Sequence, residues 1–447
     1  MTLRGWLVFV LVVLLAAAGA GAWLRAEGTS PEIRAPGAIR IGAAPSALAL
    51  ELFDTGSGLR EVRVLLKHAR GEAALVEERY PGSWITGGSP GQVTRVELPV
   101  DPARLDLESG DAFLHVSVRD WSWRDGFRGN QSVREVPLAI DLDPPRIRVA
   151  SGLTYVSRGG AGSVAYTVSE PTSRDGVRVG DVSFRGFASG GGRTRFALFA
   201  VPTDAPPDPP IRIFAVDEAG NESEASWPAV FKERELPEAQ VTLQPRFLNT
   251  KVRGLARTEN LSIEDPAEAF REINTRLRRA NEVRVREALA SSAAEPLWHG
   301  PFEQLANSKV TSRFGERRRY YVAGKPTSEA THLGYDLAST AAAKVTAANS
   351  GRVAFAGELG IYGNCVLVDH GLGLATLYGH LSRIDVARDD RVEKGGVLGL
   401  SGATGLAGGD HLHFAILVGG TYVDTLEWWD ADWVRTHIEA RLVRSTR

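Results

Sequence analysis

The most pronounced hydrophobic pattern in the chain is an uncharged run near its N-terminus. Residues 6–24 read WLVFVLVVLLAAAGAGAWL, 19 residues without a charged side chain. A helix needs roughly 20 apolar residues to cross a bilayer. Arg4 precedes the run and tryptophans stand at both of its ends, as in helices anchored at the two membrane interfaces. The pattern predicts a cytoplasmic tip and transmembrane anchor over residues 1–25.

A cleaved signal peptide is the alternative interpretation of this segment. Ala20-Gly21-Ala22 is a small-x-small cleavage site, and residues 7–15 have the length of a signal-peptide core. Both interpretations export the remainder of the chain. We expect the uncleaved anchor, which makes this a single-pass protein of the cell membrane. The inner membrane is then a partner, and most of the chain lies on the extracytoplasmic (periplasmic) side.

Short alternating segments dominate the chain from about residue 31 to 235. FLHVSV at 113–118 and IRIFAV at 211–216 are examples, separated from their neighbours by Gly, Pro, Asp and Asn. Strands of this length at short spacing are typical of β-sandwiches. A pattern also repeats: a strand ends in Asp120 before Gly129-Asn130, and another ends in Asp217 before Gly220-Asn221. Residues 215–221 resemble the closing strands of bacterial Ig-like repeats. We predict two Ig-like β-sandwich domains, 31–143 and 144–233.

A helical period appears further along, within a linker predicted over residues 234–298. Asp265-Pro266 is a typical helix start, with Asp as the N-cap and Pro in the first turn. Phe270, Ile273, Leu277 and Ala280 follow at helical spacing with charges between them. The pattern predicts an amphipathic helix of about 20 residues with an arginine-rich, solvent-exposed face. Residues 316–329 are charged and contain Gly and Pro, so we expect a long loop there.

Composition narrows the possible functions. The chain has 447 residues and a formal net charge of −2, so nothing suggests a nucleic-acid partner, which would favour a strongly basic domain. Its one cysteine, Cys365, excludes an internal disulfide framework and a cysteine-rich zinc module. Cys365 stands in the apolar segment NCVLV, which predicts a buried strand residue.

Histidines concentrate in the C-terminal third. Five of the nine lie between positions 332 and 413, in the segments HLGYD (332–336), DHG (369–371), YGHL (378–381) and HLHF (411–414). Residues 414–418 read as a strand, so His411 and His413 would share one face of it. Two imidazoles and one carboxylate, drawn from His332, Asp336 and the H-x-H pair, would supply three zinc ligands and leave one position open. His370 is interpreted as a turn histidine.

Residues 311–424 resemble the LytM/lysostaphin-type zinc metallopeptidases, which cut peptide bonds of bacterial peptidoglycan. The matching segments are TSRFG (311–315), HLGYD (332–336), AANSGRV (347–353), YGN (362–364), YGHL (378–381), and residues 395–402 and 405–414. The resemblance implies a compact antiparallel β domain with a groove, the duplicated hybrid motif fold, here over residues 299–426. It implies His332, Asp336 and His413 as Zn²⁺ ligands, and His380 and His411 as catalytic histidines. A C-terminal helix and tail would follow over 427–447.

The expected architecture is therefore mainly β: a transmembrane helix, two sandwiches, a helical connector and a metallopeptidase domain. The expected function is a membrane-anchored zinc metalloendopeptidase acting on the stem-peptide cross-links of peptidoglycan. No H-E-x-x-H helix is present, so a histidine must serve as the base. We expect His411 in this role and His380 beside the oxyanion or the leaving amine, although the two can be exchanged.

Two other functions stay open. Some relatives lose metal ligands and only activate amidases, so a non-catalytic wall-binding scaffold or amidase activator is the alternative. A zinc peptidase acting on a protein substrate is the third. The sequence leaves open the bond that is cleaved and the oligomeric state.

Overall fold

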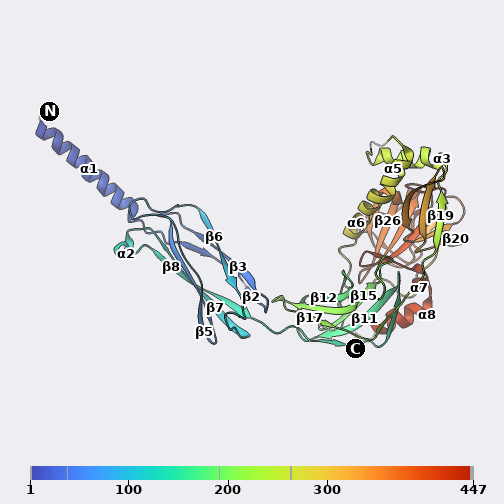
Figure 1. Ribbon diagram of the computed structural model, residues 1–447, viewed down its shortest axis with the longest axis horizontal. Coiled ribbons are helices and arrows are strands. Elements are labelled where there is room, and N and C mark those ends of the chain that lie inside the picture. Colours follow the sequence, from blue (N-terminus) through green and yellow to red (C-terminus); the bar gives the residue numbers. More distant parts are fainter. Residues whose placement is uncertain (1–2, 38, 191, 262–263, 443–447) are drawn as a thin grey trace. The chain divides into compact units, whose positions relative to one another are not determined.

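The chain folds mainly into β-sheets behind an apolar N-terminal helix, as predicted (Figure 1). The computed structural model describes residues 3–37, 39–190, 192–261 and 264–442. The chain divides into two units: residues 1–145 together with 216–222, and residues 146–215 together with 223–447.

Helix α1 (Leu3–Arg25) is the apolar helix of the first unit. It has 23 residues, an 18-residue stretch within it has a mean hydropathy of 2.5, and none of its side chains is buried in the protein. A helix that turns apolar side chains to its whole circumference is stable only inside a bilayer or against a partner. By length and composition α1 can cross a membrane. An N-terminal signal sequence has the same length and composition, so these two properties do not distinguish it from an anchor.

Two sheets that share one hydrophobic core follow α1 in the first unit. Leu50 and Leu98 from one sheet lie in this core with Val64 and Leu114 from the other. The first sheet has the order β1-β3-β6, with β1 (Glu32–Arg34), β3 (Ser46–Phe53) and β6 (Val93–Val100). The second has the order β2-β8-β7-β4-β5, with β2 (Ile39–Ile41), β8 (Gln131–Ile140), β7 (Gly110–Asp120), β4 (Leu59–His68) and β5 (Gly71–Arg79).

The repeated Asp and Gly-Asn pattern makes the same hydrogen bonds in both of its copies. Asn130 donates from its backbone N–H and its side-chain amide to the two carboxylate oxygens of Asp120, at 2.7 and 2.8 Å. Asn221 binds Asp217 in the same way, at 2.9 and 2.7 Å. Each pair closes the turn that follows a strand, so the sequence repeat reflects a repeated structural device.

The second unit begins with two further four-stranded sheets. One has the order β14-β15-β11-β9 and the other β13-β12-β16-β17. Their bounds are β9 (Ile147–Val149), β11 (Ala161–Val168), β12 (Thr172–Val179), β13 (Val182–Arg185), β14 (Phe187–Ala188), β15 (Thr194–Ala200), β16 (Ile211–Asp217) and β17 (Glu222–Ala225). Beside them, β10 (Thr154–Ser157) pairs in parallel with β18 (Ala229–Lys232). Tyr166, Phe196 and Phe199 are buried in the core of this region.

An eight-stranded sheet forms the centre of the C-terminal region. Its order is β20-β23-β31-β27-β26-β25-β29, with β32 also paired to β31. The bounds are β20 (Lys309–Ser312), β23 (Tyr335–Ala338), β25 (Gly351–Glu358), β26 (Asn364–Gly371), β27 (Leu374–Leu381), β29 (Arg391–Val392), β31 (Leu412–Val418) and β32 (Thr421–Val423). A small sheet, β24-β30-β28, joins β24 (Lys344–Thr346), β30 (Val397–Leu400) and β28 (Arg383–Ile384). Every residue of β27 and β31 is buried, which explains their continuous apolar sequences.

The helix predicted after Asp265 is present. Asp265 caps it by accepting a hydrogen bond from the Ala267 N–H, and α5 (Pro266–Glu272), η2 (Ile273–Leu277) and α6 (Arg278–Ala288) continue without a break. Ala280, expected on the apolar face, is instead exposed, and Asn281 is buried in its place. Asn281 follows Leu277 by four residues and Val285 follows Asn281 by four, so the buried face continues at helical spacing one position later than expected.

A second helical segment, which the sequence pattern missed, precedes this one. It consists of α3 (Pro245–Phe247), η1 (Leu248–Val252) and α4 (Arg253–Thr258). Leu248, Val252 and Leu255 are its buried positions. These turns are short, and a short helical pattern rich in Lys and Arg is hard to distinguish from a loop.

The loop expected over residues 316–329 was wrong. This segment is a β-hairpin of β21 (Arg317–Val322) and β22 (Lys325–Thr331), and β19 (Glu238–Thr242) pairs with β21 in parallel. The hairpin turns at Ala323 and Gly324, both with positive φ (47° and 78°), as two-residue hairpin turns require. The charges suggested a loop, but Tyr320 alternates with them and packs against Phe270.

The C-terminal segment packs onto both parts of the second unit. Asp430 caps α8 (Ala431–Trp433) by accepting hydrogen bonds from the N–H groups of Asp432 and Trp433, and η4 (Val434–Glu439) continues it. Glu427, in α7 (Thr425–Trp429), accepts a hydrogen bond from the Ala161 N–H of β11 at 2.8 Å. Burial raises the pKa of Glu427 to about 8, and nearby Asp424 adds to the shift.

We expect Glu427 to make the second unit less stable as the pH rises. In the unfolded chain a glutamate ionises near pH 4.3, whereas the folded chain holds this proton up to about pH 8. Unfolding between these two pH values releases a proton. The stability that Glu427 contributes is therefore fully present below the lower pH and is lost as the pH rises through the higher one. The slope is at most about 1.4 kcal/mol per pH unit. Glu427→Gln should weaken the pH dependence of the unfolding midpoint between pH 5 and 8. Glu287→Gln, on the exposed side of α6, should leave this pH dependence unchanged.

Candidate active site

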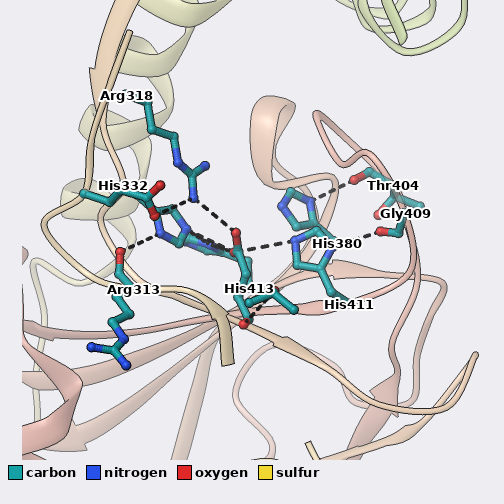
Figure 2. A network of polar contacts seen from close by, with 11 residues as sticks. Arg313, Arg318, His332, His380, Thr404, Gly409, His411 and His413 are labelled. Carbon is teal, nitrogen blue, oxygen red and sulfur yellow. Dashed lines mark hydrogen bonds and ion pairs between the residues drawn. The ribbon is translucent and has the colours of Figure 1, made fainter. Parts of the chain in front are cut away.

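Three donor atoms from distant parts of the chain form a close triangle. His332 Nε2 lies 3.0 Å from Asp336 Oδ1 and 3.1 Å from His413 Nδ1. His413 Nδ1 lies 2.9 Å from the same Asp336 oxygen. Figure 2 shows the two imidazoles converging on this point. These are the three residues predicted as metal ligands.

The central sheet brings the three side chains together. Asp336 on β23 is the register partner of His413 on β31, so their side chains lie on the same face of adjacent strands. His332 precedes β23, and its backbone N–H donates to the Glu316 carbonyl at 2.9 Å. The H-x-x-x-D spacing thus reaches from the end of one strand into the next, and the H-x-H strand supplies the third donor.

The hydrogen bonds of these histidines suit a cation. His332 Nδ1 lies 2.9 Å from the Arg313 carbonyl, which can only accept, so Nδ1 carries the proton and Nε2 presents a lone pair. Together with His413 Nδ1, the triangle offers two imidazole nitrogens and a carboxylate oxygen, the kinds of ligand that zinc prefers. Ligands at about 2.05 Å from a tetrahedral ion lie about 3.3 Å apart, close to the spacings found here. The residues present therefore fit a zinc ion.

The electrostatics of the site favour an ionised Asp336. Burial alone would raise its pKa, but the interaction with His332 and the other surrounding imidazoles outweighs burial and holds the pKa of Asp336 well below its usual range. Burial lowers the pKa of His413 to about 4, so this imidazole is neutral near pH 7. A carboxylate and a neutral imidazole are the ligand forms that a metal ion binds.

Arg318, on the hairpin that the sequence pattern missed, also contacts the site. Its guanidinium lies 3.5 Å from Asp336 Oδ2 and 3.6 Å from Glu316, and its side chain is largely buried (Figure 2). It interacts with the second carboxylate oxygen of Asp336, while the first belongs to the donor triangle. The sequence offered no signal for this role, because Arg318 is the middle one of three consecutive arginines.

The two histidines predicted to be catalytic lie beside the triangle. His380 Nδ1 donates to the Thr404 carbonyl and His411 Nδ1 to the Gly409 carbonyl, each at 2.9 Å (Figure 2). Since carbonyls only accept, both rings keep a lone pair on Nε2. The ring centroids are 4.8 Å apart, and His411 Nε2 lies 3.5 Å from Asp336 Oδ1. The structure thus brings all five predicted side chains to one place.

The environments of the two rings differ. Burial and the neighbouring histidines lower the pKa of His380 to about 3. For His411, burial would lower the pKa, but the nearby Asp336 carboxylate favours the protonated ring and outweighs burial, so the pKa of His411 is raised. His380 also has φ = 65°, a left-handed backbone conformation that is uncommon outside glycine and tends to occur at functional sites.

The residues interpreted as structural lie away from the triangle. His370 is fully buried, with Nδ1 2.7 Å from the Ser350 carbonyl and Nε2 2.8 Å from the Thr376 hydroxyl. Tyr378 packs in β27, and its hydroxyl accepts from the Ala348 N–H at 2.7 Å. Cys365 is fully buried, and burial raises the pKa of its thiol above the usual range. It is not a nucleophile candidate.

A cavity of about 820 Å³ opens over the five side chains. One wall comes from the two helical segments, through Phe247, Lys251, Phe270 and Arg278. Lys251 donates to the carbonyl of Ala403, which lies in a glycine-rich loop. The Thr404 carbonyl of the same loop accepts from His380. The cationic wall residues suit a substrate that carries carboxylates.

Gly334, inside the H-x-x-x-D motif, allows His413 to reach the triangle. A Cβ at position 334 would lie 2.7 Å from the Phe414 carbonyl and 2.8 Å from the His413 ring. Gly334→Ala should therefore displace His413 and lower zinc affinity by about 10- to 100-fold, a range typical of disturbing the groups around metal ligands. Competition with a chromophoric chelator measures this. Gly254→Ala, where a Cβ meets no atom within 4 Å, should keep wild-type affinity.

Comparison with known proteins places the C-terminal region in a family. The sequence pattern of Peptidase family M23 matches residues 330–425, which include all five side chains. These residues form an M23 peptidase domain. The M23 domain is thus the part of the chain whose family is identified. Its relatives are metal-dependent peptidases.

Individual proteins are also similar to this chain. The chain is 34% identical over 122 residues to the DD-carboxypeptidase/endopeptidase Mpg of Neisseria meningitidis and 33% identical over 122 residues to the peptidoglycan DD-endopeptidase ShyB of Vibrio cholerae. The match covers 27% of this chain, and 27% and 28% of those two relatives. A crystal structure of an M23 peptidase from Pseudomonas aeruginosa is 22% identical and covers 63% of this chain and 96% of that one, with a TM-score of 0.38.

Proposed function

We propose that this protein is a membrane-anchored zinc endopeptidase that hydrolyses peptide cross-links of peptidoglycan. The donor triangle of His332, Asp336 and His413 carries the proposal, because three lone-pair atoms meet there beside two further imidazoles. The similarity of the M23 domain to peptidoglycan DD-endopeptidases supports the substrate class. The cationic cavity wall fits the carboxylates of stem peptides.

The residues would share the chemistry as follows. His332, Asp336 and His413 would hold zinc, which when bound supplies a Lewis acid that polarises a carbonyl and activates water. His411, whose basicity Asp336 increases, accepts the proton of the attacking water at Nε2. His380 faces the same space and presents Nε2 to the oxyanion or the leaving amine. The carbonyls of Thr404 and Gly409 keep both rings in the tautomer that this requires.

The remainder of the chain would position this domain. Helix α1 would stay uncleaved in the inner membrane, with the chain after Arg25 in the periplasm. We infer that residues 31–143 and 144–233 are two Ig-like spacers, that 234–298 connects them to the peptidase domain at 299–426, and that 427–447 completes it. The spacers would hold the active site away from the bilayer and near the wall.

Digestion of purified sacculi by the full chain in detergent tests the proposal. Zinc-loaded protein should release cross-linked stem-peptide fragments that mass spectrometry identifies, and a chelator should stop the release. The absence of release by a folded, zinc-loaded sample would contradict the proposal and favour the scaffold or amidase activator. Release from a protein substrate alone would favour the third function. The fragment masses also identify the bond that is cut.

A further inference from the structure

An aromatic cluster lies directly beyond the last turn of α1, at one end of the first sandwich. It consists of Trp84, Trp121, Trp123 and Phe127. Ring centroids are 5.3 Å apart for Trp84 and Trp121, 6.1 Å for Trp84 and Phe127, and 5.7 Å for Trp123 and Phe127. Two loops supply these rings, the turn around residues 83–87 and the segment that contains α2 (Arg124–Phe127). Figure 1 shows α2 beside the point where α1 meets the sheets.

Hydrogen bonds join the cluster to the last turn of α1. Arg25 Nη2 donates to the Trp121 carbonyl at 2.7 Å, and the Arg25 carbonyl accepts from the Trp123 N–H at 2.8 Å. Arg124 donates from Nε to the Ala26 carbonyl at 2.9 Å. The last turn of the helix is therefore held to the segment that contains α2, and Trp123 Nε1 donates to the Trp84 carbonyl of the other loop at 2.6 Å.

The surface of the cluster is apolar where water would otherwise meet it. Ile85, at the tip of its turn, is 82% exposed and Phe127 is 55% exposed. Phe127 has φ = 70°, and Asp125 before it has φ = 52°. A bulky residue in the left-handed region is strained. Burial inside the protein does not offset this strain, because the ring remains largely exposed.

The length of α1 places this surface in the interface of a bilayer. Residues 6–24 rise about 28 Å as a helix, which matches the ~30 Å hydrocarbon core. Arg25 then lies at the boundary, and groups hydrogen-bonded to it lie in the headgroup layer. Tryptophan favours that layer, phenylalanine inserts at its boundary with the acyl chains, and Arg124 and Arg128, both exposed beside the cluster, suit lipid phosphates.

We propose that the loops around Trp84–Thr86 and Trp123–Phe127 form a second membrane contact, seated in the headgroup layer that α1 crosses. The occupant of this surface is the lipid interface. The proposal rests on α1 remaining in the membrane, as stated under the proposed function. Its consequence is mechanical: the first sandwich leaves the bilayer at a set angle and acts as a stiff base.

A depth measurement on the full chain in phosphatidylcholine/phosphatidylglycerol nanodiscs tests this. Ile85→Cys carries a polarity-sensitive fluorophore, and native Cys365 stays unlabelled because it is fully buried. Nitroxide lipids labelled at a shallow position should quench the Ile85→Cys probe at least about twofold more than an Ala69→Cys probe. Ala69 is exposed in the turn after β4, whose ten residues span about 33 Å. Adding Phe127→Ser to Ile85→Cys should reduce the quenching.

The outcomes separate the surface from the anchor. Release of the chain by alkaline carbonate, or a mature chain that lacks residues 1–25, overturns the anchor and the second contact together. Retention with equally weak quenching of both probes overturns the second contact alone. Quenching that Phe127→Ser leaves unchanged shows a loop that is only tethered near the bilayer, which also overturns the contact. None of these results alters the activity test on sacculi.

Discussion

His413→Ala is expected to abolish peptide-bond hydrolysis and to lower zinc affinity roughly 10³-fold or more, beyond the 10- to 100-fold cost of disturbing groups outside the ligands. The substitution removes the donor on β31 that meets Asp336 at 2.9 Å. His332 and Asp336 cannot hold the ion in the same place alone, because a catalytic zinc site uses three protein ligands. Fragment release from sacculi and chelator competition measure the two effects.

Two measurements keep this result interpretable. His299→Ala, an exposed histidine of the same region, should retain activity and zinc affinity. The metal-free His413→Ala protein should keep the circular dichroism spectrum of the metal-free wild type, so that lost activity is not lost folding. Wild-type zinc affinity in His413→Ala would contradict the assignment of the triangle. Cells that carry His413→Ala and show a wild-type cell wall would favour the scaffold.

Trp428→Ala is expected to have the largest effect on stability, about 3–5 kcal/mol, the usual range for a buried tryptophan. Trp428 is fully buried and contacts Trp298 and Phe302 edge-to-face, with ring centroids 6.0 and 5.7 Å apart. Truncation leaves a cavity that these large rings cannot fill. Chemical denaturation of the full chain, followed through the second unit, measures the loss.

Leu426→Ala is the matched control for this substitution. Leu426 lies in the same helix, α7, but is 49% exposed. Its truncation should cost less than about 1 kcal/mol, because surface substitutions rarely cost more. Equal losses for the two variants would show that Trp428 does not belong to the core. A large loss only at Trp428 would show that residues outside the matched segment 330–425 complete the domain.

Local patterns predicted the elements whose signal lies within a few neighbouring residues. The apolar run of α1, the N-cap at Asp265 and the alternation of the strands are of this kind, and each was confirmed. The hairpin of β21 and β22 was missed because three arginines concealed its alternation. In the predicted helix, Leu277 is buried as expected, but Ala280 was wrong because Asn281, four residues after Leu277, takes the buried position although it is polar.

For the site, residue types and short spacings indicated the histidine-rich segments, and the resemblance to the LytM/lysostaphin-type peptidases then implied the five candidates. Their roles stay predictions, but an imidazole pair on one strand face is a local geometric fact that the sequence contains.

The sequence by itself determined that this is a β-rich chain with one apolar helix and a histidine-rich, peptidase-like C-terminal region. Only the tertiary structure decided that His332 and His413, 81 residues apart, point at the same carboxylate, and that Arg318 and Lys251 border the site. It also decided which tryptophans are core and which face outward. The physical reason is that strand register and burial depend on pairing between distant segments, and no local pattern encodes that pairing.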